Sequence, residues 1–339
     1  MSMHRTTTFA AALCAALASG TFAQAQTEKT SLALPTLTVT FMPVYIAKDL
    51  GFWEKLGLEV SLHDITGIGA TNAMLAGSVD FTVHSGETLI RGNMRGQKMQ
   101  GVALMAQGVA FEITMTKQAA GNVTMSRPLV ERAQLLKGKT ISMAAPKTVV
   151  DGFLRYIASK ADLNHERDYK VTYMLPPAAL AALRKGDIDA AALNFPWTKM
   201  AQTDGAVLVA SGLTDVSELL PAAATSTSTR ADFCKENRSI CVKLVKGYVQ
   251  AHAYVHANPE GTFEVARKRM PKTNLQDLRA SLDALRKDTP RVPAYSEIGF
   301  KHAQELMLVG GMIRKDEMLS SFSDIHTNEF VNLATRPGS

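Results

Sequence analysis

Two short polar segments follow the two clearest buried-strand patterns of the chain. Residues 84–87 (HSGE) follow the apolar run 79–83, and residues 194–197 (NFPW) follow the apolar run 188–193. Ligands of open α/β sheets bind outside the carboxyl ends of the strands, so these groups are expected to face each other across a cleft between two lobes. His84 would then donate a ring N–H group to an anion, although a lone histidine in this position is as often a hydrogen-bonded structural residue.

The aromatic residues near these segments have two interpretations. Phe195 and Trp197 form either a wall on which a ligand ring stacks or wedges in the core beside Pro196, and Tyr45 has the same two interpretations. Glu112 is either a surface residue or a cleft acid that would favour a ligand with an amine. A histidine, a lysine, hydroxyl groups and several aromatic rings together favour a small organic anion.

Two expected helix starts offer groups to an anion. Residues 66–71 (TGIGAT) have glycine at 67 and 69 and a threonine at each end, so backbone N–H groups can approach a ligand closely and a hydroxyl can cap the helix. Lys147 and Thr148 stand before the amphipathic segment 150–161. The plain alternatives are a connecting turn in the first case and a solvated loop lysine in the second.

A unit of helix end, tight turn and strand occurs twice. Residues 74–81 (MLAGSVDF) are echoed by residues 183–190 (LRKGDIDA), with the same three-residue step from Gly77 to Asp80 and from Gly186 to Asp189. Each glycine lies where a helix end favours a left-handed residue. The repeat predicts two similar α/β lobes, and 339 residues are enough for both.

The first 25 residues have the pattern of a secretory signal peptide: Arg5, the apolar stretch 9–20 and an Ala-x-Ala site that ends at Ala25. Cys14 lies inside the apolar stretch after Leu13 rather than after a small residue, so it is interpreted as part of the discarded peptide and not as a lipid attachment site. Cleavage after Ala25 leaves 36 basic and 31 acidic residues, a net charge of +5. This excess fits attraction of small anions, but it is equally an ordinary surface.

Cys234 and Cys241 are the cysteines that remain after cleavage. In an oxidising compartment they would close a small disulfide loop; the alternative is two buried thiols stacked on one helix face. No histidine pattern accompanies them, so no metal site is expected. No catalytic motif or nucleic-acid motif is present, and no cofactor is expected.

The order of the elements predicts the domain boundaries. Residues 36–41 are the expected first strand, residues 110–116 leave the first lobe, and the small polar segment 222–229 is either a returning strand, which we favour, or a loose linker. Residues 232–330 are helical by pattern. The prediction is a signal peptide at 1–25, a flexible start at 26–34, lobe one at 35–113 plus 217–339, and lobe two at 114–216.

Several sequence segments resemble periplasmic solute-binding proteins of ABC importers of the nitrate, taurine and aliphatic-sulfonate type, and they occur in the same order as in that family. They are residues 43–60 (PVYIAKDLGFWEKLGLEV), 67–83, 94–105, 135–163, 182–197 and 256–266 (HANPEGTFEVA). The resemblance implies an α/β, two-lobed periplasmic binding protein of type II-like fold, with a central mixed sheet in each lobe and a C-terminal helical block. It also implies a clamp that closes on one small molecule.

Carried over by position, the resemblance implies that the ligand shell comes from five segments, three in lobe one and two in lobe two. The residues are Met42, Pro43, Tyr45, Gly69, Ala70, Thr71, His84, Ser85, Gly86, Lys147, Thr148, Val149, Asn194, Phe195 and Trp197.

The function implied is capture of a sulfonate or an aliphatic or aromatic carboxylate and its delivery to an ABC permease in the inner membrane. A monomeric periplasmic protein without nucleic-acid partners is expected. The alternatives are an importer component for pyrimidines or amines, and a ligand-sensing lobe for a membrane receptor. An enzyme is not expected, although thiamine-pyrimidine synthesis proteins use a related fold with a cysteine-rich motif that this sequence lacks.

Overall fold

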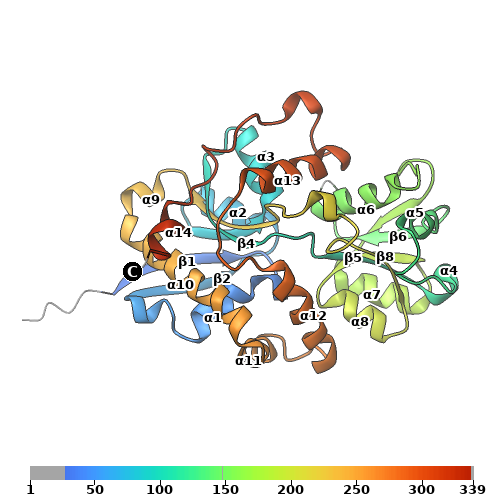
Figure 1. Ribbon diagram of the computed structural model, residues 1–339, viewed down its shortest axis with the longest axis horizontal. Coiled ribbons are helices and arrows are strands. Elements are labelled where there is room, and N and C mark those ends of the chain that lie inside the picture. The colour runs from blue at the N-terminus through green and yellow to red at the C-terminus, as the bar shows by residue number, and fades with distance from the viewer. Residues whose placement is uncertain (1–26, 147, 337–339) are drawn as a thin grey trace, which may run out of the picture.

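The computed structural model describes residues 27–146 and 148–336, and it has two lobes that lie side by side (Figure 1). The expected signal peptide, with Cys14, and the expected ligand residue Lys147 lie outside the described residues. Each lobe has one five-stranded mixed sheet with helices on both faces, and a block of helices follows at the C-terminal end. The predicted two-lobed α/β fold with its C-terminal helical block is therefore confirmed.

Lobe one has the strand order β2-β1-β3-β10-β4. Strands β1, β2 and β3 are parallel, whereas β10 is antiparallel to both of its neighbours, β3 and β4. The strands are β1 (Glu28–Leu34), β2 (Leu58–Asp64), β3 (Phe81–Ser85), β4 (Met99–Ala106) and β10 (Thr225–Arg230). The helices between them are α1 (Met42–Asp49), α2 (Ile68–Leu75) and α3 (Gly86–Met94), with short 3-10 turns η1 (Val39–Phe41) and η2 (Glu54–Leu56).

The first strand does not lie where the sequence predicts it. Strand β1 occupies Glu28–Leu34, inside the segment expected to be flexible, whereas residues 36–41 form a loop and the turn η1. Residues 32–34 are buried against β2 and β3, and this burial decides the register. The alternating pattern of residues 36–41 arises for another reason: Val39 and Phe41 pack into the core, Leu37 is exposed, and the three threonines face a cleft.

Lobe two has the strand order β7-β6-β8-β5-β9. Strand β5 pairs antiparallel to β8 and β9, so the first crossing between lobes lies between Ala106 and Phe111, a few residues before the predicted boundary at 113. The strands are β5 (Phe111–Met115), β6 (Thr140–Met143), β7 (Lys170–Tyr173), β8 (Ala190–Asn194) and β9 (Val207–Ser211). The helices are α4 (Lys117–Ala120), α5 (Leu129–Gln134), α6 (Val149–Ser159), α7 (Pro176–Lys185) and α8 (Trp197–Thr203), and the turn η3 (Ser217–Leu219) lies in the return to lobe one.

The repeated sequence unit has the same structural role in both lobes. Gly77 and Gly186 adopt positive φ angles of 77° and 76°, as the helix ends predict. The carboxylate of Asp80 accepts hydrogen bonds from the hydroxyl group of Thr30 (2.8 Å) and from the backbone of β1. In lobe two the Asp189 carboxylate accepts the N–H group at the start of β6 at 2.8 Å. Asp80 thus holds the start of β3 against β1, and Asp189 holds the start of β8 against β6.

The small polar segment is the returning strand, as favoured from the sequence. Strand β10 lies between β3 and β4, and residues 226–229 are fully buried. Serine and threonine side chains are short enough to fit between the sheet and the layers of helices above and below it. Strand β4 is joined to the other strands of the sheet through β10.

The C-terminal block covers lobe one and reaches lobe two. Helix α13 packs on the lobe-one sheet and also crosses α6, where Gly310 and Gly152 approach so closely that a Cβ atom on Gly310 would lie 2.7 Å from the Gly152 Cα atom. On α12, the Asp277 carboxylate accepts a hydrogen bond from Thr203 of α8. The helices are α9 (Phe233–Glu236), α10 (Arg238–Ala257), α11 (Pro259–Arg269), α12 (Leu275–Asp288), α13 (Glu297–Val309) and α14 (Glu329–Ala334), with the turn η4 (Lys315–Glu317).

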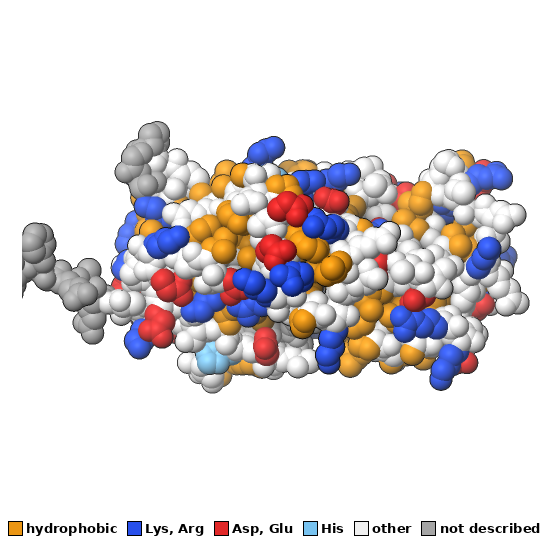
Figure 2. Space-filling view, turned by 90° about the horizontal axis from the view of Figure 1, so that it is seen from below, with side chains coloured by type: hydrophobic (Ala, Val, Ile, Leu, Met, Phe, Trp, Pro, Cys, Tyr) orange, Lys and Arg blue, Asp and Glu red, His pale blue; other side chains and the backbone are white. Residues whose placement is uncertain are grey.

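Within the described part of the chain, no helix has the length and apolar character needed to cross a bilayer. Figure 2 shows acidic and basic side chains mixed on one face, so the small net positive charge is not gathered into one patch there. Of the two interpretations of the net charge, attraction of small anions or an ordinary surface, this face fits the ordinary surface.

Cys234 and Cys241 form a disulfide between α9 and α10, with Cα atoms 5.7 Å apart. Replacing both cysteines by alanine is expected to lower the free energy of unfolding by about 2 kcal/mol, because the short loop no longer restricts the unfolded chain. Guanidinium unfolding with and without dithiothreitol measures this. The reductant should shift the wild-type midpoint to that of the double variant and leave the variant unchanged; a wild-type midpoint that ignores the reductant would contradict the expectation.

Candidate functional site

A cavity of about 200 Å³ lies between the lobes, at the carboxyl ends of β1, β3 and β8. We call it the cleft. Its walls come from the loop after β1, the end of β3, the first crossing, the start of α6, the end of β8 and the approach to β10. The lining residues are Pro35, Thr36, Thr38, Thr40, Phe41, His84, Ser85, Gly108, Val109, Ala110, Phe111, Val149, Asn194, Ala224 and Thr225.

His84 and Ser85 end strand β3 and both line the cleft. The hydroxyl group of Ser85 caps helix α3 by accepting the N–H group of Thr88 at 3.3 Å. The His84 ring is buried, with Nδ1 at 2.8 Å from the Ser85 carbonyl oxygen. Burial lowers the pKa of His84 to about 4, so the ring is neutral at pH 7.

Lobe two contributes Val149, at the start of α6, and Asn194, at the end of β8. Thr148 does not cap α6, because its hydroxyl group donates to the Ala145 carbonyl oxygen at 2.8 Å. The first N–H groups of this 11-residue helix therefore have no side-chain cap beside the cleft. A helix N-terminus in this state favours negative charge.

The loop after β1 supplies five lining residues that were not predicted. Three are threonines at positions 36, 38 and 40, and the hydroxyl group of Thr38 donates across the lobe boundary to the Phe195 carbonyl oxygen at 3.3 Å. The first crossing supplies four more, Gly108 to Phe111. The threonine spacing was a usable signal, but residues 36–41 were assigned to a strand.

Three predicted residues of α1 lie away from the cleft lining. Met42, Pro43 and Tyr45 are buried, and the Arg269 guanidinium lies 5.2 Å from the centre of the Tyr45 ring. Burial raises the pKa of the Tyr45 hydroxyl group. Tyr45 borders a different cavity, of about 540 Å³, which the loop at residues 35–36 separates from the cleft.

The glycine-rich helix start also lies outside the cleft lining. Gly69, Ala70 and Thr71 form the first turn of α2, where Ala70 and Thr71 are buried. The N–H group of Gly69 donates to Thr66, and that of Ala70 donates to Gly67. These two groups are therefore used within the turn rather than offered to an anion.

The remaining predicted residues pack rather than line the cavity. Phe195 is 2% exposed and lies in the lobe-one core cluster, and Trp197 packs against the α7–β8 cluster of lobe two. Both match the core-wedge interpretation. Gly86 lies against the backbone of Ala223, where no side chain would fit, since a Cβ atom on Gly86 would be 1.6 Å from the Ala223 carbonyl oxygen.

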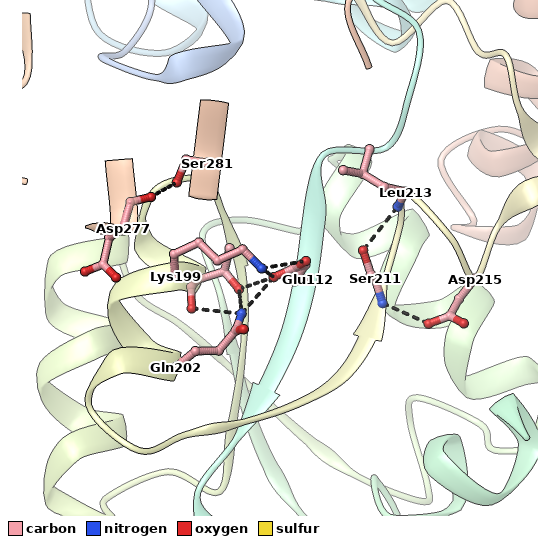
Figure 3. A network of polar contacts seen from close by, with 9 residues as sticks. Glu112, Lys199, Gln202, Ser211, Leu213, Asp215, Asp277 and Ser281 are labelled. Atoms are coloured by element: carbon pink, nitrogen blue, oxygen red, sulfur yellow. Dashed lines mark hydrogen bonds and ion pairs between the residues drawn. The ribbon is translucent and has the colours of Figure 1, made fainter. Parts of the chain in front are cut away.

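Glu112 is neither a surface residue nor part of the cleft lining. It is 4% exposed and accepts hydrogen bonds from Thr198 (2.7 Å), Gln202 (2.9 Å) and Lys199 (3.1 Å), which converge on its carboxylate from α8 (Figure 3). The negative charge is therefore balanced locally. The described lining residues include no acid and no lysine or arginine.

The arrangement suits a small molecule with an apolar body and a polar end. Phe41, Val109 and Phe111 give apolar contacts, while hydroxyl groups, one amide and one imidazole give hydrogen bonds. No cluster of three or more histidine, cysteine, aspartate or glutamate side chains with metal-binding geometry occurs among the residues described.

Comparison with known proteins gives one family match and distant relatives. Residues 25–268 match the model of the NMT1-like family. The bicarbonate transport ATP-binding protein CmpC of Synechocystis is 27% identical over 255 residues, which are 70% of this chain and 37% of that protein. The chain thus spans little more than a third of this curated relative.

Two solved structures show the shared fold. The alkanesulfonate-binding protein SsuA of Xanthomonas axonopodis, bound to MOPS, has a TM-score of 0.67 and 16% identity, covering 86% of this chain and 96% of SsuA. The desulfurization enzyme DSZB has a TM-score of 0.65 and 13% identity, covering 91% of this chain and 98% of that chain. A mutant of DSZB with the same fold is in complex with biphenyl-2-sulfinic acid.

Proposed function

The chain belongs to the NMT1-like family, and we propose that it is the solute-binding component of an ABC importer, which captures a small organic anion between its lobes and delivers it to a membrane permease. The observation that carries this proposal is the cleft, because its lining comes from both lobes at the carboxyl ends of their strands. A ligand held by both lobes stabilises their closed arrangement, and the closed arrangement is what a permease can recognise.

An organic anion fits the groups of the cleft better than the alternatives. The uncapped start of α6 and the hydroxyl groups of Thr36 and Thr40 donate hydrogen bonds to a sulfonate or carboxylate. The apolar wall then covers an organic body, which a bare inorganic anion lacks. SsuA is named for binding an alkanesulfonate, which fits this class of ligand, whereas CmpC is named for the transport of bicarbonate, an anion without an organic body.

The other candidate functions have less support. An amine would need a partner acid, yet the described lining has none and Glu112 is already paired with Lys199. A pyrimidine would stack on Phe41 or Phe111, but it carries no negative charge for the uncapped start of α6. The desulfurization enzyme DSZB shares the fold, and the mutant of it that holds biphenyl-2-sulfinic acid has serine in place of a cysteine. The described lining of the cleft has no cysteine.

The same proposal includes a periplasmic, monomeric protein released by cleavage of residues 1–25. In the alternative sensing role, a membrane receptor recognises the closed form of the protein, and the ligand binds in the same cleft. The identity of the neighbouring genes distinguishes this role from import.

A thermal-shift screen tests the ligand class. The compounds are aliphatic and aromatic sulfonates and carboxylates, nitrate, bicarbonate, pyrimidines and amines. An anion at about 100 times its Kd is expected to stabilise the folded protein by about 2.7 kcal/mol. Asn194→Leu should weaken binding about tenfold or more, because it removes one polar contact of lobe two and introduces none.

Asn332→Leu is the matched control, since Asn332 is exposed on α14, away from the cleft lining. It should leave the affinity unchanged. Stabilisation by amines alone would contradict the anion, and an affinity that survives Asn194→Leu would contradict the cleft as its site.

A further inference from the structure

The two ring nitrogens of His84 have different roles that the geometry fixes. Nδ1 lies 2.8 Å from the Ser85 carbonyl oxygen. A carbonyl oxygen only accepts hydrogen bonds, so Nδ1 carries the proton and donates it. In the neutral ring Nε2 then holds a lone pair. The sequence suggested that His84 donates a ring N–H group to an anion. The neutral ring cannot do so, because its only N–H group, at Nδ1, already donates to Ser85; a second proton at Nε2 would be needed.

The Nε2 atom lacks a partner among the described residues, although it is buried. The side chain is 6% exposed and borders the cleft. Burial also keeps the ring neutral, because it lowers the pKa of His84 to about 4. A buried acceptor without a donor is costly, and native proteins rarely leave one unexplained. A donor that arrives with the ligand explains it.

Location distinguishes His84 from a second histidine with the same pattern. His252 is buried, donates from Nδ1 to the Pro290 carbonyl oxygen at 2.7 Å, and has an unpartnered Nε2 atom within the described chain. It lies on α10 and is not part of the cleft lining. An unpartnered nitrogen alone therefore does not indicate a ligand; His84 differs because it stands where a ligand would bind.

We propose that Nε2 of His84 accepts a hydrogen bond from a hydroxyl group of the ligand, so that the cleft selects hydroxy-substituted organic anions over their unsubstituted analogues. This inference rests on the proposed function of the cleft. The anionic end of the ligand lies at the start of α6 in lobe two, and its donor group lies at the end of β3 in lobe one. The ligand thus connects the two lobes through two different kinds of contact.

Matched pairs of probes test the selection by isothermal titration calorimetry at pH 7.5 on the whole purified protein. The pairs are ethanesulfonate with 2-hydroxyethanesulfonate, and propionate with 2-hydroxypropionate. Each substituted probe is expected to bind at least about tenfold more tightly than its parent, because the parent leaves a buried acceptor unpaired. His84→Leu should abolish this preference, whereas His252→Leu, the matched control, should keep it.

The outcomes separate this inference from the proposed function. Equal binding of both members of each pair, with anions still bound, overturns the role of His84 and leaves the anion site intact. Binding only of uncharged donors such as propionamide overturns the anion proposal and supports the donor requirement.

If no probe binds, or if His84→Leu does not fold, ¹⁵N NMR of the histidine rings in the wild-type protein decides. The inference requires His84 to be protonated at Nδ1 and to have a lone pair at Nε2 at pH 7.5. A proton on Nε2 overturns it.

Discussion

Replacing Gly86 by alanine is expected to lower the free energy of unfolding by about 3 kcal/mol or more. A Cβ atom at this position would lie 1.6 Å from the Ala223 carbonyl oxygen and 2.7 Å from its carbon. Neither backbone can move freely, since the N–H group of Gly86 donates to Ala224 and that of Ala223 donates to Gly299. Forced overpacking of this kind typically costs about 1–3 kcal/mol, and a clash with fixed backbone lies at the upper end or beyond.

Gly69→Ala is the matched control, because this glycine was predicted as a ligand contact on the same grounds. The atom nearest to a Cβ at Gly69 is a methyl carbon of Ile65 at 3.3 Å, and the residue lies in the first turn of α2. Its free energy of unfolding should change by less than about 1 kcal/mol. Guanidinium unfolding measures both variants. A Gly86→Ala protein as stable as the Gly69→Ala control would show that the strand ends can separate.

Asp288→Asn is expected to stabilise the protein by up to about 4 kcal/mol at pH 8 and to change little at pH 4. Asp288 ends α12 and is 3% exposed. The N–H groups of Gln107 and Gly108 lie near its carboxylate, but neither oxygen has a hydrogen-bond partner among the described residues. Burial therefore raises the pKa of this carboxyl group from 3.8 to about 7.

The sign follows from the proton that the folded state retains. Between about pH 4 and pH 7 the folded protein keeps this proton while the unfolded chain releases it, so the contribution of Asp288 to stability falls as the pH rises. A difference of about three pKa units corresponds to about 4 kcal/mol. Asparagine carries no charge at any of these pH values, so the penalty disappears.

The measurement must use the difference between variant and wild type. Burial also raises the pKa of Glu87 to about 7, so Glu87 adds a slope of the same sign to the dependence of the free energy of unfolding on pH. Burial lowers the pKa values of His84 and His252 to about 4, so these two residues oppose that slope as the pH falls below 6.5. Free energies of unfolding at pH 4, 6 and 8 for wild type, Asp288→Asn and the control Glu87→Gln isolate each contribution. A flat difference between wild type and Asp288→Asn would contradict the prediction.

Much of the fold was predictable because the repeated unit encodes it locally. Gly77 and Gly186 mark two helix ends, and the apolar runs after them are the central strands β3 and β8. The first strand was missed because residues 28–34 begin with charged and hydroxyl residues, and only pairing with β2 and β3 makes their second half a core strand. Such pairing is tertiary and has no local signature.

The site was harder to predict than the fold. His84, Ser85, Val149 and Asn194 follow strands or precede a helix, so position alone indicated them, and they do line the cleft. The spacing of the threonines in the loop after β1 is a signal, but their alternation with apolar residues is also typical of a strand, and this second interpretation hides their place in the cleft. Tyr45 and Phe195 could not be excluded as ligand contacts either, since a sequence does not show whether an aromatic side chain points into the core or into a cleft.

The position of β10 has a consequence for the order in which the protein acquires structure. A growing chain that has reached Ser211 contains all five strands of lobe two, which run without interruption from Phe111. At that stage β4 has no partner in the sheet of lobe one, because β10, the strand between β3 and β4, has not yet been synthesised. The lobe whose synthesis begins first therefore completes its sheet last, and the two edges that β10 covers, one of β3 and one of β4, stay open to chaperones until the segment 225–230 arrives.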